Sequence, residues 1–247
     1  MRKILAGIAF LLSGCIIIPS PPQSDLFQAK TIETKNLSIA VWEKNDIQKG
    51  QPLRLYFEGD GNPNPRYKVA FDLAEADQYN NVIYIARPCQ WVEDKKCAQT
   101  PAIYKESRFH PEIMQEMQEL VSYLMRKYNA PSLELIGYDG GAVIALNLAS
   151  KLPTKRIITI AGITDINAYN LQNDLPQQDE SEIENPAQNL NTIATISQIH
   201  YVGQNDDITP RRLVERFVAR MQNPRSAVVK VVPDTGHTDW RSIKLDY

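Results

Sequence analysis

The feature that most constrains the fold of this chain is a strand-turn-helix pattern at residues 133–151. Residues 133–138 form an apolar run, which predicts a buried strand, and residues 140–151 have the pattern of a helix. Gly137 and Gly141 flank the turn between them, and Asp139 lies at its tip. The sequence therefore places a carboxylate where a strand leads directly into a helix.

Short apolar runs alternate with helical patterns along the rest of the chain. We expect strands at residues 37–42, 53–57, 81–86, 156–161, 198–202 and 227–232, and helices at residues 66–76, 111–128 and 210–221. In the longest of these helices the apolar residues recur at helical spacing on one face. Strand-helix-strand order predicts an α/β fold, a mostly parallel sheet with helices on both faces.

The first residues have the pattern of an export signal. Arg2 and Lys3 precede an apolar stretch at residues 4–12 that is too short for a stable membrane anchor. The run LSGC at residues 12–15 resembles the bacterial lipoprotein cleavage box, which implies cleavage before Cys15 and lipidation of its thiol. The alternative is an ordinary secretory signal with an incidental cysteine.

Lipidation would divide the chain into three parts. Residues 1–14 are then a signal peptide, residues 15–35 carry the lipidated Cys15 and a Pro-rich tether, and residues 36–247 form one folded domain. Two or more acyl chains would hold the protein on a membrane surface. An isoleucine, Ile16, follows the lipid-bearing cysteine, and this resembles lipoproteins that are sorted to the outer membrane more than those retained in the inner membrane. We therefore expect a lipid-anchored protein of the cell envelope that faces the periplasm.

Charge and cysteine content bound the partners and cofactors. The net charge of −2 gives no indication of nucleic-acid binding. Besides Cys15 the chain has Cys89 and Cys97, and an even pair in an exported protein predicts a short-range disulfide. No group of histidines or cysteines has the spacing of metal ligands, so we expect neither a metal nor an organic cofactor.

Two loops after late strands carry candidate catalytic groups. Asp206 follows one predicted strand and precedes a predicted helix, with Asp207 as the alternative acid. His237 follows the last predicted strand, whereas His110 has the position of a helix-start residue and His200 lies inside a strand pattern. Because ligands and catalytic groups gather at the carboxyl ends of parallel strands, we expect His237 to be the base.

An early loop offers candidate donors for a developing negative charge. It leaves the strand predicted at residues 53–57 and turns on Gly59 and Gly61. With Asp60 between them, these residues can present backbone N–H groups, and the N–H of Gly140 adds a donor directly after Asp139.

The order of elbow residue, acid and histidine resembles that of α/β-hydrolases, in which the glycine-flanked turn holds the nucleophile. The chain is similar in particular to a proteobacterial group of small lipoprotein α/β-hydrolases, whose members generally have serine at the elbow. The matching motifs are FEGDG at 57–61, YIARPCQ at 84–90, RF at 108–109, GYDGG at 137–141, ENPA at 184–187 and the loops of Asp206 and His237. The resemblance implies an α/β-hydrolase fold with a small lid at residues 164–190; a plain surface excursion is the alternative for that segment.

Asp139 at the elbow admits two interpretations. In haloalkane dehalogenases and epoxide hydrolases an aspartate at this place attacks carbon, and a histidine activates the water that hydrolyses the resulting ester. Asp139, His237 and Asp206 would then act on a small-molecule substrate that is ester-like or alkyl. Alternatively Asp139 caps the following helix, since aspartate is among the best N-caps, and the protein is an inactive binding or scaffold protein.

Overall fold

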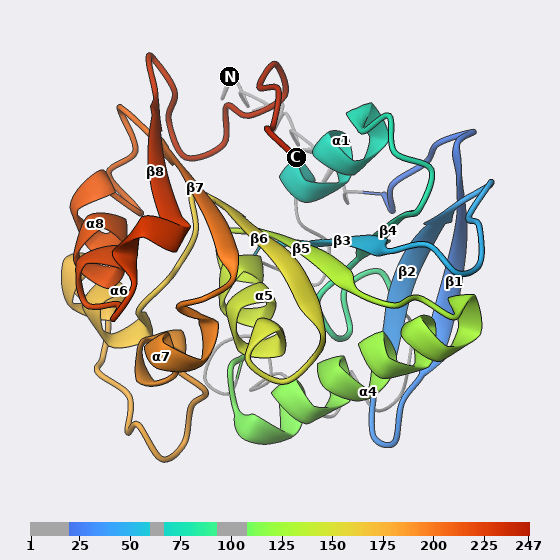
Figure 1. The fold of residues 1–247 in the computed structure, drawn as a ribbon, viewed down its shortest axis with the longest axis horizontal. Coiled ribbons are helices and arrows are strands. Elements are labelled where there is room, and N and C mark those ends of the chain that lie inside the picture. Colours follow the sequence, from blue (N-terminus) through green and yellow to red (C-terminus); the bar gives the residue numbers. More distant parts are fainter. Residues whose placement is uncertain (1–19, 60–66, 93–107) are drawn as a thin grey trace, which may run out of the picture.

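The computed structural model describes residues 20–59, 67–92 and 108–247, and these residues form one sheet with the strand order β1-β2-β4-β3-β5-β6-β7-β8 (Figure 1). The strands are β1 (Phe27–Glu33), β2 (Ser38–Lys44), β3 (Leu53–Phe57), β4 (Val82–Ile85), β5 (Leu133–Tyr138), β6 (Thr154–Ile160), β7 (Ser197–Gly203) and β8 (Ala227–Val232). The described helices are α1 (Val69–Ala76), α4 (Pro111–Tyr128), α5 (Gly141–Ala149), α6 (Ile166–Gln172), α7 (Leu190–Ile193) and α8 (Arg211–Ala219), with short 3-10 turns at Pro186–Gln188 and Pro224–Ser226.

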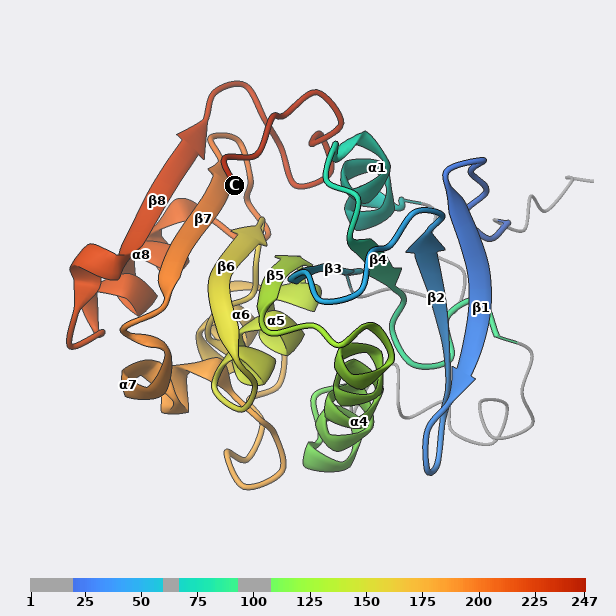
Figure 2. The same ribbon diagram turned by 45° about the vertical axis from the view of Figure 1, so that its right-hand side comes forward.

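The sheet is mostly parallel and is covered on both faces. Strands β3 to β8 run parallel, while β2 pairs antiparallel with both β1 and β4. In Figure 2, α1 and the segment after β8 lie on one side of the sheet, and α4 and α5 lie on the other. One core contains Phe71 of α1 and Trp240, and the second contains Met117 of α4 and Ile144 of α5. The predicted α/β architecture is therefore confirmed.

The central elements follow from mostly apolar sequence. Every residue of β4 and β5 is buried, as expected for strands covered on both faces. Every residue of α5 is buried as well, so this helix lies inside the protein and not on its surface. By contrast, α4 is amphipathic; it begins after the capping side chain of His110 and ends at Asn129, whose φ of 51° is left-handed.

The sheet begins earlier than the sequence predicted. We expected a tether up to residue 35, but β1 starts at Phe27 and pairs with β2 over its full length, from Phe27 opposite Lys44 to Glu33 opposite Ser38. Most side chains of β1 are exposed, so the strand lacks the apolar alternation by which strands are recognised in a sequence. Backbone hydrogen bonds to β2 hold this edge strand in place.

The segment at residues 164–190 contains more regular structure than a loop. It includes α6, whose first turn is capped by the side chain of Asp165 through the Ala168 N–H. Asn185 donates to Asp165 and accepts from the Ile166 N–H, which ties the two ends of the segment together. The segment is thus an ordered, polar excursion that contains α6 and the 3-10 turn at Pro186–Gln188.

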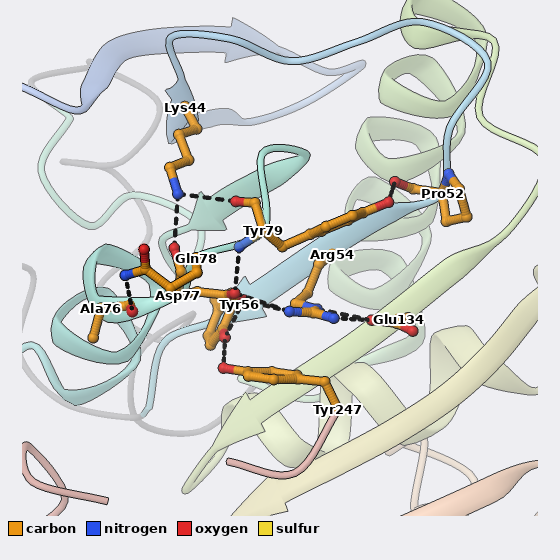
Figure 3. A network of polar contacts seen from close by, with 10 residues as sticks. All are labelled: Lys44, Pro52, Arg54, Tyr56, Ala76, Asp77, Gln78, Tyr79, Glu134 and Tyr247. Atoms are coloured by element: carbon orange, nitrogen blue, oxygen red, sulfur yellow. Dashed lines mark hydrogen bonds and ion pairs between the residues drawn. The ribbon is translucent and has the colours of Figure 1, made fainter. Parts of the chain in front are cut away.

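A buried polar network joins the end of the described chain to the sheet. The guanidinium of Arg54 pairs with Asp77 at 2.8 Å and with Glu134 at 2.7 Å. Tyr56 donates to Asp77, and the Tyr247 ring lies 3.7 Å from the Arg54 guanidinium (Figure 3). The network connects β3, β5, the loop after α1 and the segment that follows β8.

None of the helices in residues 20–59, 67–92 and 108–247 combines the length and apolarity needed to cross a membrane.

Candidate active site

The register of the parallel strands brings four loop positions to one edge of the sheet. Phe57 of β3 lies opposite Gly137 of β5, and Gly203 of β7 lies opposite Val232 of β8. The residues that follow these strands include Glu58, Asp139, Asp206 and His237. The carboxyl edge of the sheet therefore collects acidic groups and one imidazole, as expected for a ligand-binding edge.

Asp139 lies on a sharp turn whose shape requires its two flanking glycines. Its φ is 48°, a left-handed conformation that aspartate tolerates at a cost of about 1–2 kcal/mol. A Cβ at Gly137 would lie 2.4 Å from the Gly141 oxygen, and a Cβ at Gly141 would lie 2.2 Å from the Phe57 oxygen. Strand β5, helix α5 and the end of β3 approach so closely that only glycine fits at both positions.

The conformation of Asp139 differs from that of a helix cap. Capping residues have extended backbone angles, whereas Asp139 is left-handed and Gly140 occupies the N-cap position of α5. The main-chain oxygen of Asp139 accepts from the Ala142 and Ile163 N–H groups at 3.1 and 3.0 Å. Its carboxylate lies instead beside the ring of His237.

His237 lies between two carboxylates. Its Nε2 atom is 3.6 Å from Oδ1 of Asp139, and its Nδ1 atom is 3.0 Å from Oδ2 of Asp206. The Asp206 side chain is fully buried, while the side chains of Asp139 and His237 keep 11% and 14% of their surface exposed. The two partially exposed groups are thus the ones that a molecule from solution can reach.

The loop after β7 holds Asp206 rigidly toward His237. Oδ1 of Asp206 accepts from the Ile208 and Thr209 N–H groups, both at 2.9 Å, and Oδ2 accepts from the Thr209 hydroxyl at 2.7 Å. The adjacent Asp207 is exposed. Of the two acids that the sequence left open, Asp206 is therefore the one that contacts the histidine.

Burial and charge shift the pKa values of this group in opposite ways. Burial alone would lower the pKa of His237, but the charged Asp139 carboxylate at 3.6 Å and the hydrogen-bonded Asp206 carboxylate outweigh burial and raise it to about 9. Burial likewise opposes ionisation of Asp206, yet the bonds from His237 and Thr209 lower the pKa of its carboxyl. At neutral pH the ring is a cation that bridges two carboxylates.

Solved structures with the same arrangement of strands and helices identify the fold. An α/β serine hydrolase without a lid from Xanthomonas campestris is 17% identical, with a TM-score of 0.56 over 90% of both chains. An α/β serine hydrolase homologue from Coxiella burnetii is 13% identical, with a TM-score of 0.61 over 89% of this chain and 92% of that chain. An esterase from Pyrococcus furiosus is 16% identical, with a TM-score of 0.60 over 92% of both chains. The fold is that of the α/β-hydrolases. No protein-family model and no curated protein matches the sequence.

Within this α/β-hydrolase fold, aromatic residues brace the histidine loop. The Tyr138 ring lies 5.6 Å from the His237 ring, and its hydroxyl donates to the His237 carbonyl at 3.3 Å. The buried Trp240 donates its indole N–H to the same carbonyl at 2.7 Å. Both contacts fix the backbone that carries the imidazole.

The structure describes two of the four predicted backbone donors, Gly140 and Gly59, and these two have different surroundings. Gly140 directly follows Asp139 at the start of α5. Gly59 lies against Asp139, but its N–H donates to Oε1 of Glu58 at 3.0 Å and would have to leave that carboxylate to contact a substrate. Asp60 and Gly61 lie outside the described residues.

The remaining predicted residues are only partly covered. Cys89 is buried, but Cys97 and Cys15 lie outside the described residues, so the disulfide and the lipidation stay predictions. His200 lies in β7, where Thr159 contacts its Nδ1 at 2.8 Å, and it takes no part in the site. Among the described residues, no group of three or more His, Cys, Asp or Glu side chains is arranged to hold a metal ion.

Sequence reasoning assigned no role to three residues that support the site. Thr209 anchors Asp206, and an aspartate followed by threonine three positions later is a local turn pattern that could have indicated it. Glu58 and Gln90 occur within the matched motifs, but no sequence pattern indicates their contacts to Gly59.

Proposed function

We propose that this protein is a hydrolase in which Asp139 is the nucleophile, His237 activates water and Asp206 orients His237. The observation that carries the proposal is the placement of the His237 ring, 3.6 Å from Asp139 on one side and 3.0 Å from Asp206 on the other. An elbow carboxylate, an imidazole and a buried orienting acid are the parts needed for covalent hydrolysis.

The first step forms an ester on Asp139. A carboxylate is already a nucleophile at neutral pH and needs no base to activate it. One Asp139 oxygen attacks a saturated carbon of the substrate, a carbon–oxygen bond forms, and the leaving group departs with the electron pair of the broken bond. Attack on an acyl carbon would instead give a mixed anhydride, which is less stable than an ester. The chemistry therefore favours an alkyl substrate with a leaving group.

Esterification prepares His237 for the second step. The ester is neutral, so His237 loses the Asp139 charge that helps to raise its pKa. The ring then gives its proton to the leaving group or to solvent and becomes a neutral base. It takes a proton from water, the hydroxide attacks the Asp139 carbonyl carbon, and the alcohol leaves with that proton.

Backbone groups near the elbow support this second step. Negative charge develops on an Asp139 oxygen when hydroxide adds to the ester. The N–H of Gly140 follows the nucleophile at the start of α5, where the helix dipole also favours negative charge. We assign Gly140 as a donor to that oxygen. We propose that a backbone N–H of the loop at residues 59–61 is the second donor to that oxygen.

We place the enzyme on a membrane through lipidation of Cys15, in the cell envelope. The support is the LSGC run at residues 12–15 and the Pro-rich sequence after it. Replacement of Cys15 by serine should release the protein from the membrane fraction of a bacterial host that processes lipoproteins. Unchanged membrane association of that variant would contradict the anchor.

Turnover of small alkyl substrates tests the catalytic proposal. A panel of short haloalkanes and epoxides can be screened by proton release or by gas chromatography of the product. We expect turnover by the wild type and a loss of at least about 1,000-fold in Asp139→Asn and Asp139→Ala, with the fold retained. Unchanged turnover in either variant would contradict the assignment of Asp139.

A serine at the elbow distinguishes an enzyme from an inactive relative. His237 and Asp206 are placed to activate a hydroxyl at this position, so Asp139→Ser should gain esterase activity on a short activated ester. If the wild type shows no turnover and Asp139→Ser shows no esterase activity, the protein is a binding or scaffold protein.

A further inference from the structure

Two buried side chains outside the catalytic group, those of Glu58 and Gln90, form hydrogen bonds with the backbone N–H and the backbone carbonyl of Gly59. The Gly59 N–H donates to Oε1 of Glu58 at 3.0 Å. The Gly59 carbonyl accepts from Nε2 of Gln90 at 3.4 Å. Glu58 and Gln90 are each 1% exposed, so both contacts lie in the protein interior and not at its surface. These contacts clamp one glycine from two sides.

The clamped glycine lies against the proposed nucleophile. A Cβ at Gly59 would lie 2.9 Å from the Tyr138 ring and 3.0 Å from Cβ of Asp139. The Gly59 backbone therefore forms a wall directly beside Asp139. A shift of this wall would free the Asp139 side chain to turn away from His237.

Glu58 is itself fixed by two other elements. Its Oε2 accepts from the Tyr84 hydroxyl of β4 at 3.0 Å, and its Oε1 also accepts from the Ala70 N–H in the first turn of α1 at 3.5 Å. Burial raises the pKa of Glu58 to about 7, although hydrogen bonds from Gly59 and Tyr84 oppose the shift. The side chain thus ties the end of β3 to β4 and α1.

Gln90 is fixed by its own loop. Its Oε1 accepts from the Arg87 N–H at 2.9 Å, which leaves Nε2 directed at the Gly59 carbonyl. Gln90 belongs to the RPCQ run at residues 87–90. The proposed catalytic mechanism assigns no role to this motif. Its amide is suited to this task because it offers an acceptor and a donor on one planar group.

We propose that Glu58 and Gln90 are positioning residues that hold Gly59 against Asp139 and so keep its carboxylate aligned for attack. The proposal rests on the proposed function of Asp139. Reactions of this kind depend on alignment, and a displacement of about 1 Å can reduce the rate about 100-fold. Loss of the clamp should therefore slow ester formation while substrate binding is retained.

The rate of ester formation on Asp139 tests the clamp. It is measured by mass spectrometry after rapid mixing of excess enzyme with an alkyl substrate from the turnover screen. Gln90→Leu removes the donor to Gly59, and Gln90→Glu removes it when the new carboxyl is ionised while keeping the length of the side chain and an acceptor for Arg87. We expect both to slow ester formation about 10- to 100-fold, with the half-saturating substrate concentration changed less than about threefold.

Control variants separate positioning from a general loss of structure. Gln115→Leu makes the same change at an exposed position of α4 and should keep the wild-type rate. Glu58→Ala should be slowed at least about 10-fold, and Glu58→Gln should recover part of that loss because an amide oxygen can still accept from Gly59. Thermal unfolding of each variant shows whether it is folded.

The outcomes are distinguishable. Slow ester formation in both Gln90 variants with unchanged half-saturation supports the clamp. Wild-type rates in folded Gln90→Leu and Gln90→Glu would overturn the clamp and leave the role of Asp139 intact. Absence of ester on Asp139 in His237→Gln, which keeps the nucleophile but lacks the base for hydrolysis, would overturn the proposed function, and the clamp with it.

Discussion

Nε2 of His237 lies 3.6 Å from Oδ1 of Asp139, a contact between a ring that follows β8 and a carboxylate that follows β5. The distance is longer than a hydrogen bond, so the two groups are paired by charge and are not locked together. A water or a substrate carbon can replace this contact when the side chains move slightly.

Replacement of His237 should stop the reaction half-way. In His237→Gln, Asp139 can still attack an alkyl substrate, but no base remains to activate water for hydrolysis of the ester. We expect an enzyme that gains the mass of one alkyl group and does not turn over, with the modification on the peptide that contains Asp139. The double variant His237→Gln, Asp139→Asn is the control and should stay unmodified; a modified control would refute the assignment.

Removal of the Asp206 charge should lower the pKa of His237. Asp206 contributes both a hydrogen bond and a charge to the raised value of about 9. NMR titration of the His237 ring in Asp206→Asn should give a lower pKa than in the wild type, and turnover should fall at least about 100-fold. Asp207→Asn changes the adjacent, exposed acid and should leave both quantities unchanged. An unshifted pKa in Asp206→Asn would contradict the described contact.

His200 should make the protein less stable in mild acid. Burial lowers the pKa of this histidine to about 4, whereas in the unfolded chain it is near the ordinary value of 6.5. The unfolded chain therefore binds the proton first, and the free energy of unfolding should fall by about 3 kcal/mol as the pH drops from 6.5 to 4.

Chemical denaturation at several pH values measures this effect. His200→Leu should remove most of the acid dependence between pH 6.5 and 4, because no group then titrates at this buried position. His110→Asn removes a histidine but keeps a capping side chain at the start of α4, and it should retain the wild-type dependence. Equal acid sensitivity of His200→Leu and wild type would show that other groups dominate.

Loss of Arg54 should destabilise the fold strongly. Its guanidinium is buried and paired with Asp77 and Glu134, so Arg54→Met leaves two carboxylates without their partner (Figure 3). We expect the free energy of unfolding to decrease by about 3–5 kcal/mol. Arg241→Met breaks an exposed pair with Asp72 and should change it by less than about 1 kcal/mol. Similar losses in both variants by denaturant titration would contradict the energetic role of the network.

The fold was predictable because most residues of its inner strands are apolar. The predicted bounds of β3, β5 and β8 agree with the structure, and those strands include the central pair of the sheet. Strand β1 was not predicted, because its side chains are mostly exposed and only its backbone pairing with β2 makes it a strand. The helix of the segment at residues 164–190 was missed for a similar reason, since polar residues dominate the segment in which it lies.

The site was predictable where the position of a residue in a loop after a strand is enough to place it. Asp206 and His237 follow strands, and the sheet brings them together with Asp139. The sequence could not separate a capping aspartate from an elbow aspartate, because both precede a helix; the φ of 48° at Asp139 separates them. The burial of Glu58 was also out of reach, because a glutamate after a strand usually faces solvent.

The most direct test of the central claim is a single turnover in ¹⁸O-labelled water, with enzyme in excess over an alkyl substrate. If Asp139 forms an ester that water hydrolyses at the carbonyl carbon, one oxygen of its carboxylate is replaced by oxygen from water. We predict ¹⁸O in the peptide that contains Asp139 and unlabelled oxygen in the product alcohol. An unlabelled Asp139 together with an ¹⁸O-labelled product would show that water attacks the substrate directly and that Asp139 is not the nucleophile.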